Sequence, residues 1–108
     1  MAHPTQQPQV VAIEISVDTD GTFNKPPALK HVEIGDTISW FNSAGAFSVV
    51  FQKDGTPFAN SLSKFNDPNQ TGTTQYSGRY LYSVSAVDKK GKLHQVSGCP
   101  ELEVDGGS

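Results

Sequence analysis

The chain has almost no cysteine, and this scarcity excludes several kinds of site. It contains one Cys among 108 residues, so it forms neither an internal disulfide nor a metal cluster with several cysteine ligands. No apolar run reaches the roughly 18 residues of a membrane span. The start of the chain is polar and has no hydrophobic segment typical of a signal peptide. If the protein is exported, we expect its signal to have been removed.

Positive charge is also scarce. Eight Lys and Arg residues stand against eleven Asp and Glu residues, which gives a formal net charge of −3. Nucleic acids and anionic membranes require a basic face, so the sequence predicts neither as a partner. Hydrophobic residues make up 35% of the chain and ten glycines accompany them, a composition that is compatible with one small folded core.

No segment shows the apolar period of a sustained helix, whereas several show the two-residue period of a half-buried strand. The segments with clear alternation are 10–18, 47–52 and 80–87. Shorter candidates, bounded by Gly, Pro, Asn or Asp, are 30–34, 37–42, 92–96 and 101–105. The sequence therefore predicts about seven short strands, arranged as a sandwich of two antiparallel sheets or as a small barrel.

Turn residues indicate how these strands connect. Gly35 and Asp36 predict a tight, hairpin-like turn, and the segment 88–91 (Asp-Lys-Lys-Gly) has the pattern of a type I turn followed by a bulge. The crossover 56–78 is rich in Pro, Asn and Thr, so we expect at most one helical turn in it. Its apolar residues should pack on the core; they are Phe58, Leu62 and Phe65.

The predicted organisation is a single domain at 10–105. A polar N-terminal tail at 1–9 precedes it, and a short C-terminal tail at 106–108 follows.

One stretch, Glu-Ile-Gly-Asp-Thr-Ile-Ser-Trp-Phe-Asn at 33–42, carries a recognisable pattern. The strand 47–51, the segment Arg-Tyr-Leu-Tyr-Ser-Val at 79–84 and the segment Pro-Glu-Leu-Glu-Val at 100–104 follow it in order. Together these elements resemble the cupredoxin family. That resemblance implies an all-β, cupredoxin-like Greek-key β-sandwich with at most one short helix in the 56–78 crossover. Within the motif, Trp40 is expected at the centre of the core, and Asn42 is expected to satisfy backbone groups where its strand ends.

The same resemblance implies where type 1 copper would bind. The family uses a His soon after the Trp-x-Asn, then a late Cys and a second His, usually followed by Met, because thiolate and imidazole ligands suit copper. Here the segment 43–48 contains no His, the strand 80–85 contains no Cys, and Cys99 comes later with neither His nor Met after it. We therefore predict a domain without the copper site and without a bound cofactor.

Two residues remain candidates for a different metal site. His94 and Cys99 lie five positions apart, but two ligands are too few for a stable centre. A third would have to come from Asp88, Glu101, His31 or a partner chain. The alternative, which we favour, is an exposed His94 on a hairpin and a Cys99 that packs as a small hydrophobic residue.

The sequence predicts no enzyme, since it has no serine-nucleophile motif, no nucleophile beside a suitable His and no phosphate-binding glycine loop. We expect a binding or interaction module for an unknown protein or small ligand. Four apolar residues occupy the polar phase of their strands and are candidates for a partner surface, which a second copy of the chain could also occupy: Phe41, Val50, Leu81 and Val87. Alternatively, the 56–78 crossover covers them. The family resemblance favours a periplasmic or secreted location.

Overall fold

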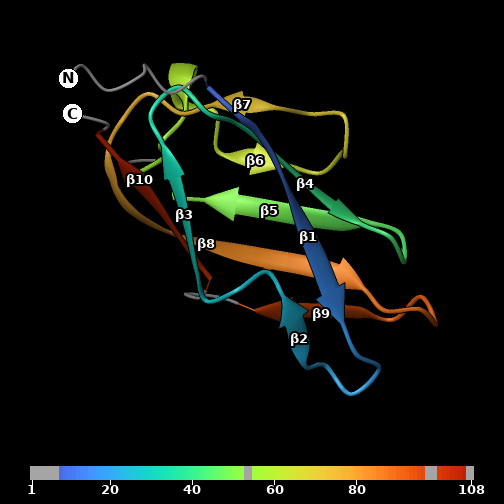
Figure 1. Cartoon of the computed structure of the whole chain (residues 1–108). Coiled ribbons are helices and arrows are strands. Elements are labelled where there is room, and N and C mark those ends of the chain that lie inside the picture. Colours follow the sequence, from blue (N-terminus) through green and yellow to red (C-terminus); the bar gives the residue numbers. More distant parts are fainter. Residues whose placement is uncertain (1–7, 53–54, 97–99, 107–108) are drawn as a thin grey trace.

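The computed structural model consists of two β-sheets packed face to face (Figure 1). It describes residues 8–52, 55–96 and 100–106. The strands, in chain order, are β1 (Val10–Val17), β2 (Phe23–Lys25), β3 (Leu29–Glu33), β4 (Thr37–Asn42), β5 (Phe47–Phe51), β6 (Lys64–Phe65), β7 (Gly72–Thr73), β8 (Gly78–Val87), β9 (Leu93–Val96) and β10 (Glu101–Asp105). A single 3₁₀ turn, η1 (Ala59–Ser61), lies in the crossover. None of the helical structure in these ranges is long or apolar enough to cross a membrane.

All seven predicted strands are present, and the prediction of a β-sandwich is confirmed. Three further strands of two or three residues, β2, β6 and β7, were not predicted because such short segments show no period. The first sheet has the strand order β2-β1-β4-β7. The second has the order β3-β10-β8-β5-β6, and β9 also pairs with β8.

The prediction of purely antiparallel sheets is wrong. β1 runs parallel to β4, and β3 runs parallel to β10. Each of these pairs joins strands that are distant in sequence, and the two-residue period that identifies a strand carries no information about the direction of its neighbour.

The hairpin predicted at Gly35 and Asp36 is also wrong, because β3 and β4 belong to different sheets. The turn is as tight as expected, with Gly35 at φ +97°, a conformation that favours glycine. The Asp36 carboxylate accepts hydrogen bonds from the backbone N–H of Glu33 (2.9 Å) and of Gln9 (2.9 Å). These contacts fix a connection that carries the chain across the core rather than back along the same sheet.

The predicted turn at 88–91 is confirmed, and it joins β8 to β9 in an antiparallel hairpin. Gly91 has the left-handed φ of +83° that the turn requires. β9 pairs with the second half of β8, and β10 pairs with the first half, on the same edge. β8 therefore forms the centre of the second sheet.

The core lies between the sheets and is centred on Trp40, which is fully buried. Its indole ring contacts four other aromatic rings at centroid distances of 4.7–6.2 Å: Phe51, Phe58, Phe65 and Tyr82. Phe58 and Phe65 come from the crossover and are fully buried, and Leu62 packs against the same core. The expectation that the crossover packs on the core is confirmed.

This packing makes Gly72 intolerant of a side chain. A Cβ at this position would lie 2.8 Å from Phe58 Cδ1 and 2.8 Å from Phe65 Cζ. We expect Gly72→Ala to lower the free energy of unfolding by about 1–3 kcal/mol, the usual cost of overpacking a core. Gly55→Ala is the matched control, because a Cβ at Gly55 has no neighbour within 4 Å. Denaturant unfolding checks this, and equal stabilities for the two variants would contradict it.

Candidate functional site

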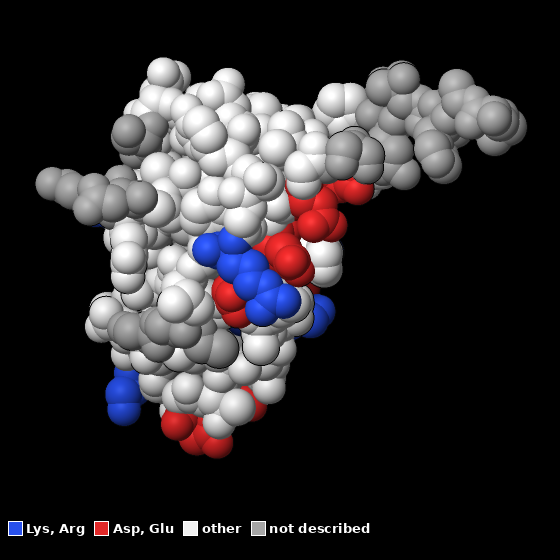
Figure 2. All heavy atoms as spheres, turned by 90° about the vertical axis from the view of Figure 1, so that its left-hand side faces the viewer, with Lys and Arg blue, Asp and Glu red and all other residues white. Residues whose placement is uncertain are grey.

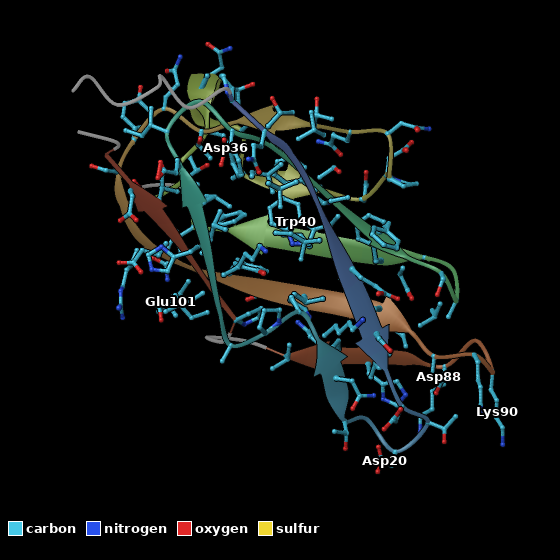
Figure 3. The ribbon with its side chains drawn as sticks, in the orientation of Figure 1. Asp20, Asp36, Trp40, Asp88, Lys90 and Glu101 are labelled. Atoms are coloured by element: carbon cyan, nitrogen blue, oxygen red, sulfur yellow. The ribbon has the colours of Figure 1, made fainter. Side chains whose placement is uncertain are left out.

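Three turns lie at the same end of the sandwich (Figure 3). They are the β1–β2 turn at 18–22, the β4–β5 loop at 43–46 and the β8–β9 turn at 88–91. In Figure 3, Asp20, Asp88 and Lys90 lie at this end, far from Asp36. The side chains with donor or acceptor atoms at this end include Asp18, Asp20, Asn42, Asp88 and His94.

The side chain of Asn42 hydrogen-bonds both to the β4–β5 loop and to the end of β8, where the β8–β9 turn begins. Its side-chain amide donates hydrogen bonds to the backbone carbonyls of Ala46 (3.1 Å) and Val87 (3.0 Å). Its carbonyl oxygen accepts a bond from the backbone N–H of Ala44 (3.1 Å). Asn42 therefore satisfies backbone groups at the end of its strand, as predicted from the motif, and it also fixes the β4–β5 loop against the end of β8.

Asp88 and His94 form a buried pair across the β8–β9 hairpin. The Nε2 atom of His94 lies 2.8 Å from Oδ2 of Asp88, and the two side chains are only 11% and 1% exposed. An ionised carboxylate can only accept, so Nε2 carries the proton. The other carboxylate oxygen of Asp88 accepts bonds from the backbone N–H groups of Lys90 (2.8 Å) and Lys92 (3.1 Å). The prediction that His94 is exposed on its hairpin is wrong, because β9 turns this side chain to the inner face beside Ala86.

These contacts stabilise the charged form of Asp88. The hydrogen bond from His94 lowers the pKa of Asp88 below its ordinary value, the amides of Lys92 and Lys90 lower it further, and burial opposes them. Asp20 also has a lowered pKa, chiefly because the backbone N–H of Thr22 donates to it. A Cβ built on Gly21 would lie 3.3 Å from Nδ1 of His94, so the β1–β2 turn packs closely against the imidazole ring.

An open groove of about 460 Å³ runs between the β1–β2 turn and the β4–β5 loop. Its lining is mixed and mostly polar, and includes Asp18, Asp20, Asn42, Ser43 and Lys89. Asp18 is already engaged, because Asn24 donates its side-chain amide to Oδ1 at 2.8 Å.

Among the described residues, the donors at this end differ from the set that type 1 copper requires. That metal requires two imidazoles and a thiolate in a trigonal arrangement, whereas the described residues here offer one imidazole and several carboxylate oxygens. Ala46 and Ser43 stand in the loop where the family places its first His. Val84, in the strand expected to deliver the Cys, is fully buried between Val49 and Val96. Within the described ranges, no group of three or more His, Cys, Asp or Glu residues could hold a metal ion.

Of the two candidate metal ligands, only one can be placed. Cys99 lies outside the described residues, so its distance from His94 is not tested. Of the third ligands considered, Asp88 contacts His94 directly. His31 lies on β3 and instead contacts Glu103 (2.7 Å) and Asp105 (3.2 Å) of β10.

The four candidates for a partner surface do not share one face. Val50, Leu81 and Val87 lie on the outward side of β5 and β8 in the second sheet, while Phe41 lies on β4 of the first sheet. Val50 is 42% exposed and Leu81 is 47% exposed. The crossover therefore does not cover these two residues, since its own aromatic side chains point into the core. Leu93, which pairs with Val87 and is 62% exposed, extends this surface and was missed because strand β9 is too short to reveal its outward phase.

Charged residues cluster at the opposite end of the same sheet. Arg79 Nε lies 3.5 Å from Glu103, and its Nη1 lies 3.9 Å from Glu101. With the contacts of His31, they form a network across β8, β10 and β3. Figure 2 shows basic and acidic side chains gathered together on this side of the molecule.

Comparison with known proteins supports the fold but does not identify an activity. Neither the scan against protein-family models nor the search of curated proteins found a match. Among solved structures, a pseudoazurin from Sinorhizobium meliltoi matches with a TM-score of 0.54 and 19% sequence identity, over 90% of this chain and 74% of that one. At this identity the likeness establishes a cupredoxin-like fold and leaves the activity open.

The Asp88–His94 pair makes a testable contribution to stability. Because the folded-state pKa of Asp88 is lowered, its stabilising effect is present above the ordinary carboxyl pKa and is lost as the pH falls through the folded value. We expect Asp88→Asn to lower the melting temperature at pH 7 and to differ less from the parent protein at acid pH, once the Asp88 carboxyl is protonated. Asp67→Asn, in an exposed turn, is the control. Melting curves of both variants from pH 7 to pH 2 check this, and a constant difference for Asp88→Asn would contradict it.

Proposed function

We propose that this chain is a copper-free binding module built on a cupredoxin-like sandwich, with no catalytic centre. The observation that carries the proposal is the donor set at the end of the sandwich. The family resemblance implies copper ligands in the segment 43–48 and in the strand 80–85, and these contain no His and no Cys, respectively. The fold thus retains the scaffold of an electron-transfer protein without the ligands for it.

The hydrogen bonds of Asp88 and His94 support the proposal that the chain has no catalytic centre. The Asp88 carboxylate is occupied by His94 and two backbone amides. Its imidazole partner contacts Asp88 and lies beside Gly21, and neither residue supplies a hydroxyl or thiol nucleophile. A buried pair of this kind braces a hairpin, and it lacks the exposed nucleophile that covalent catalysis requires.

Binding is supported by the outward side of the second sheet. Val50, Leu81 and Leu93 are each more than 40% exposed on neighbouring strands. Exposed large apolar side chains on one face of a sheet are typical of interaction surfaces. The partner class is an unknown protein or small ligand, and the family resemblance favours a periplasmic or secreted location.

Metal content tests the proposal directly. Protein expressed with copper and purified without chelator should contain no stoichiometric copper and should lack an intense thiolate-to-copper absorption band. Elemental analysis and a visible absorption spectrum provide the measurement. One copper per chain with such a band would overturn the copper-free function.

A second candidate, a copper or zinc site at His94 and Cys99, is favoured by one observation. A metal-binding imidazole commonly donates its other N–H to a carboxylate, which fixes its orientation, and Asp88 holds His94 in this manner. If this site exists, titration with Zn²⁺ or Cu²⁺ should give a sub-micromolar dissociation constant that weakens at least about tenfold in both His94→Ala and Cys99→Ser. His31→Ala is the control and should bind as the parent does. Equal affinity in all four proteins would exclude the site.

A further inference from the structure

The loop between β6 and β7, residues 66–71, contains the sequence Asn69-Gln70-Thr71. An Asn followed two positions later by Thr or Ser, with any residue except Pro between them, is the acceptor sequence for N-linked glycans in secreted proteins. No other Asn in the chain begins such a sequence. Because three-residue matches also occur by chance, the structural setting of this one decides whether a transferase can use it.

The loop is held in place by other side chains than the two that the acceptor sequence requires. Oδ1 of Asp67 accepts a hydrogen bond from the backbone N–H of Asn69 (2.8 Å), and Gln70 donates its side-chain amide to the carbonyl of Lys64 (2.7 Å). The side chains of Asn69 and Thr71 make none of the hydrogen bonds found among the described residues. Both residues are exposed, and Asn69 lies in a turn. The amide and the hydroxyl that a transferase must reach are therefore accessible in the folded protein.

The same loop lies beside unpaired edges of both sheets (Figure 1). β7 pairs with β4 only at Thr37 and Ile38, and β6 pairs with β5 only at Val49 and Val50. The registers carry the loop from β6 toward the start of β5, and then into β7 from the direction of the end of β4. Among the described strands, none therefore pairs with 39–42 of β4 or with 47–48 of β5 on the side where the loop lies.

From the exposed acceptor sequence we propose that Asn69 is the attachment site of an N-linked glycan when the chain is exported through a pathway that adds one. In this reaction Nδ2 of Asn69 attacks the anomeric carbon of an oligosaccharide carried on a lipid pyrophosphate. The bond from that carbon to the pyrophosphate oxygen breaks as the C–N bond forms. The lipid pyrophosphate leaves with the electron pair, and one amide proton passes to a base of the transferase.

A glycan at Asn69 covers the unpaired edges of β4 and β5. Free N–H and C=O groups at a sheet edge can pair with another chain and start aggregation, which proteins prevent by covering or interrupting such edges. A glycan is bulky and increases solubility. We therefore expect the modification to slow aggregation without changing the packing of the core.

Secretion of the whole chain from a eukaryotic host, behind a cleavable signal sequence, tests the attachment site. The parent should run as a heavier band that is lost on treatment with peptide N-glycosidase, which leaves Asp in place of the modified Asn69. Asn69→Gln and Thr71→Ala should lack the heavier band. Thr71→Ser should keep it, because Ser also completes the acceptor sequence. Asn66→Gln is the matched control, since Asn66 is exposed in the same loop and should not matter.

Both secreted and cell-retained protein are analysed, because the sugar is attached on entry to the pathway. An unmodified parent, or a Thr71→Ala variant modified as fully as the parent, would overturn the inference.

Light scattering on heating tests the covering of the edges. The glycosylated and the enzymatically deglycosylated parent should melt at similar temperatures, and the deglycosylated form should aggregate faster. Equal aggregation would overturn the protective role and leave the attachment site established. These outcomes are independent of the proposed function, since one copper per chain would overturn that function whether or not Asn69 carries a glycan.

Discussion

The burial of Trp40 against four aromatic rings is the contact on which the rest of the sandwich depends. Trp40 belongs to β4 in the first sheet, while Phe51 and Tyr82 belong to β5 and β8 in the second. The ring pairs are tilted or edge-on, which is the favourable geometry for aromatic contacts. The indole N–H has no hydrogen-bond partner among the described residues. Burial of these aromatic rings against one another therefore holds the two sheets together.

The polar side chains lie outside this apolar core, and several of them hold the connections at the two ends of the sandwich in place. Asp36 fixes the connection from β3 to β4 at one end, and Asn42 fixes the β4–β5 loop at the other. Asp88 accepts from His94 and from two amides of its own turn. Asp36, Asn42 and Asp88 each hydrogen-bond to backbone or imidazole groups at their own end of the molecule, so these polar atoms hold turns and strand ends in place.

Much of this was predictable from the sequence because strand periodicity and turn chemistry are local. Alternation identified the buried phase of β8, with Tyr82 and Val84 inward and Leu81 outward, and the motif around Trp40 located the core. What escaped prediction depends on distant partners. The parallel pairing of β3 with β10 joins segments about seventy residues apart, and the inward position of His94 follows from its register with Ala86. Neither the pairing partner of a strand nor its register can be read from the local sequence of that strand.

β8 links the core to the surface through the same alternation. Its inward residues, Tyr82 and Val84, pack around Trp40, so their identities are constrained by volume and shape. Its outward residues, Leu81, Ser83 and Ser85, have no such constraint from the core. A large apolar side chain at Leu81 therefore contributes little to the stability of the isolated fold and exposes surface that favours association. The core therefore constrains the inward residues of β8, while its outward residues can differ without loss of the fold.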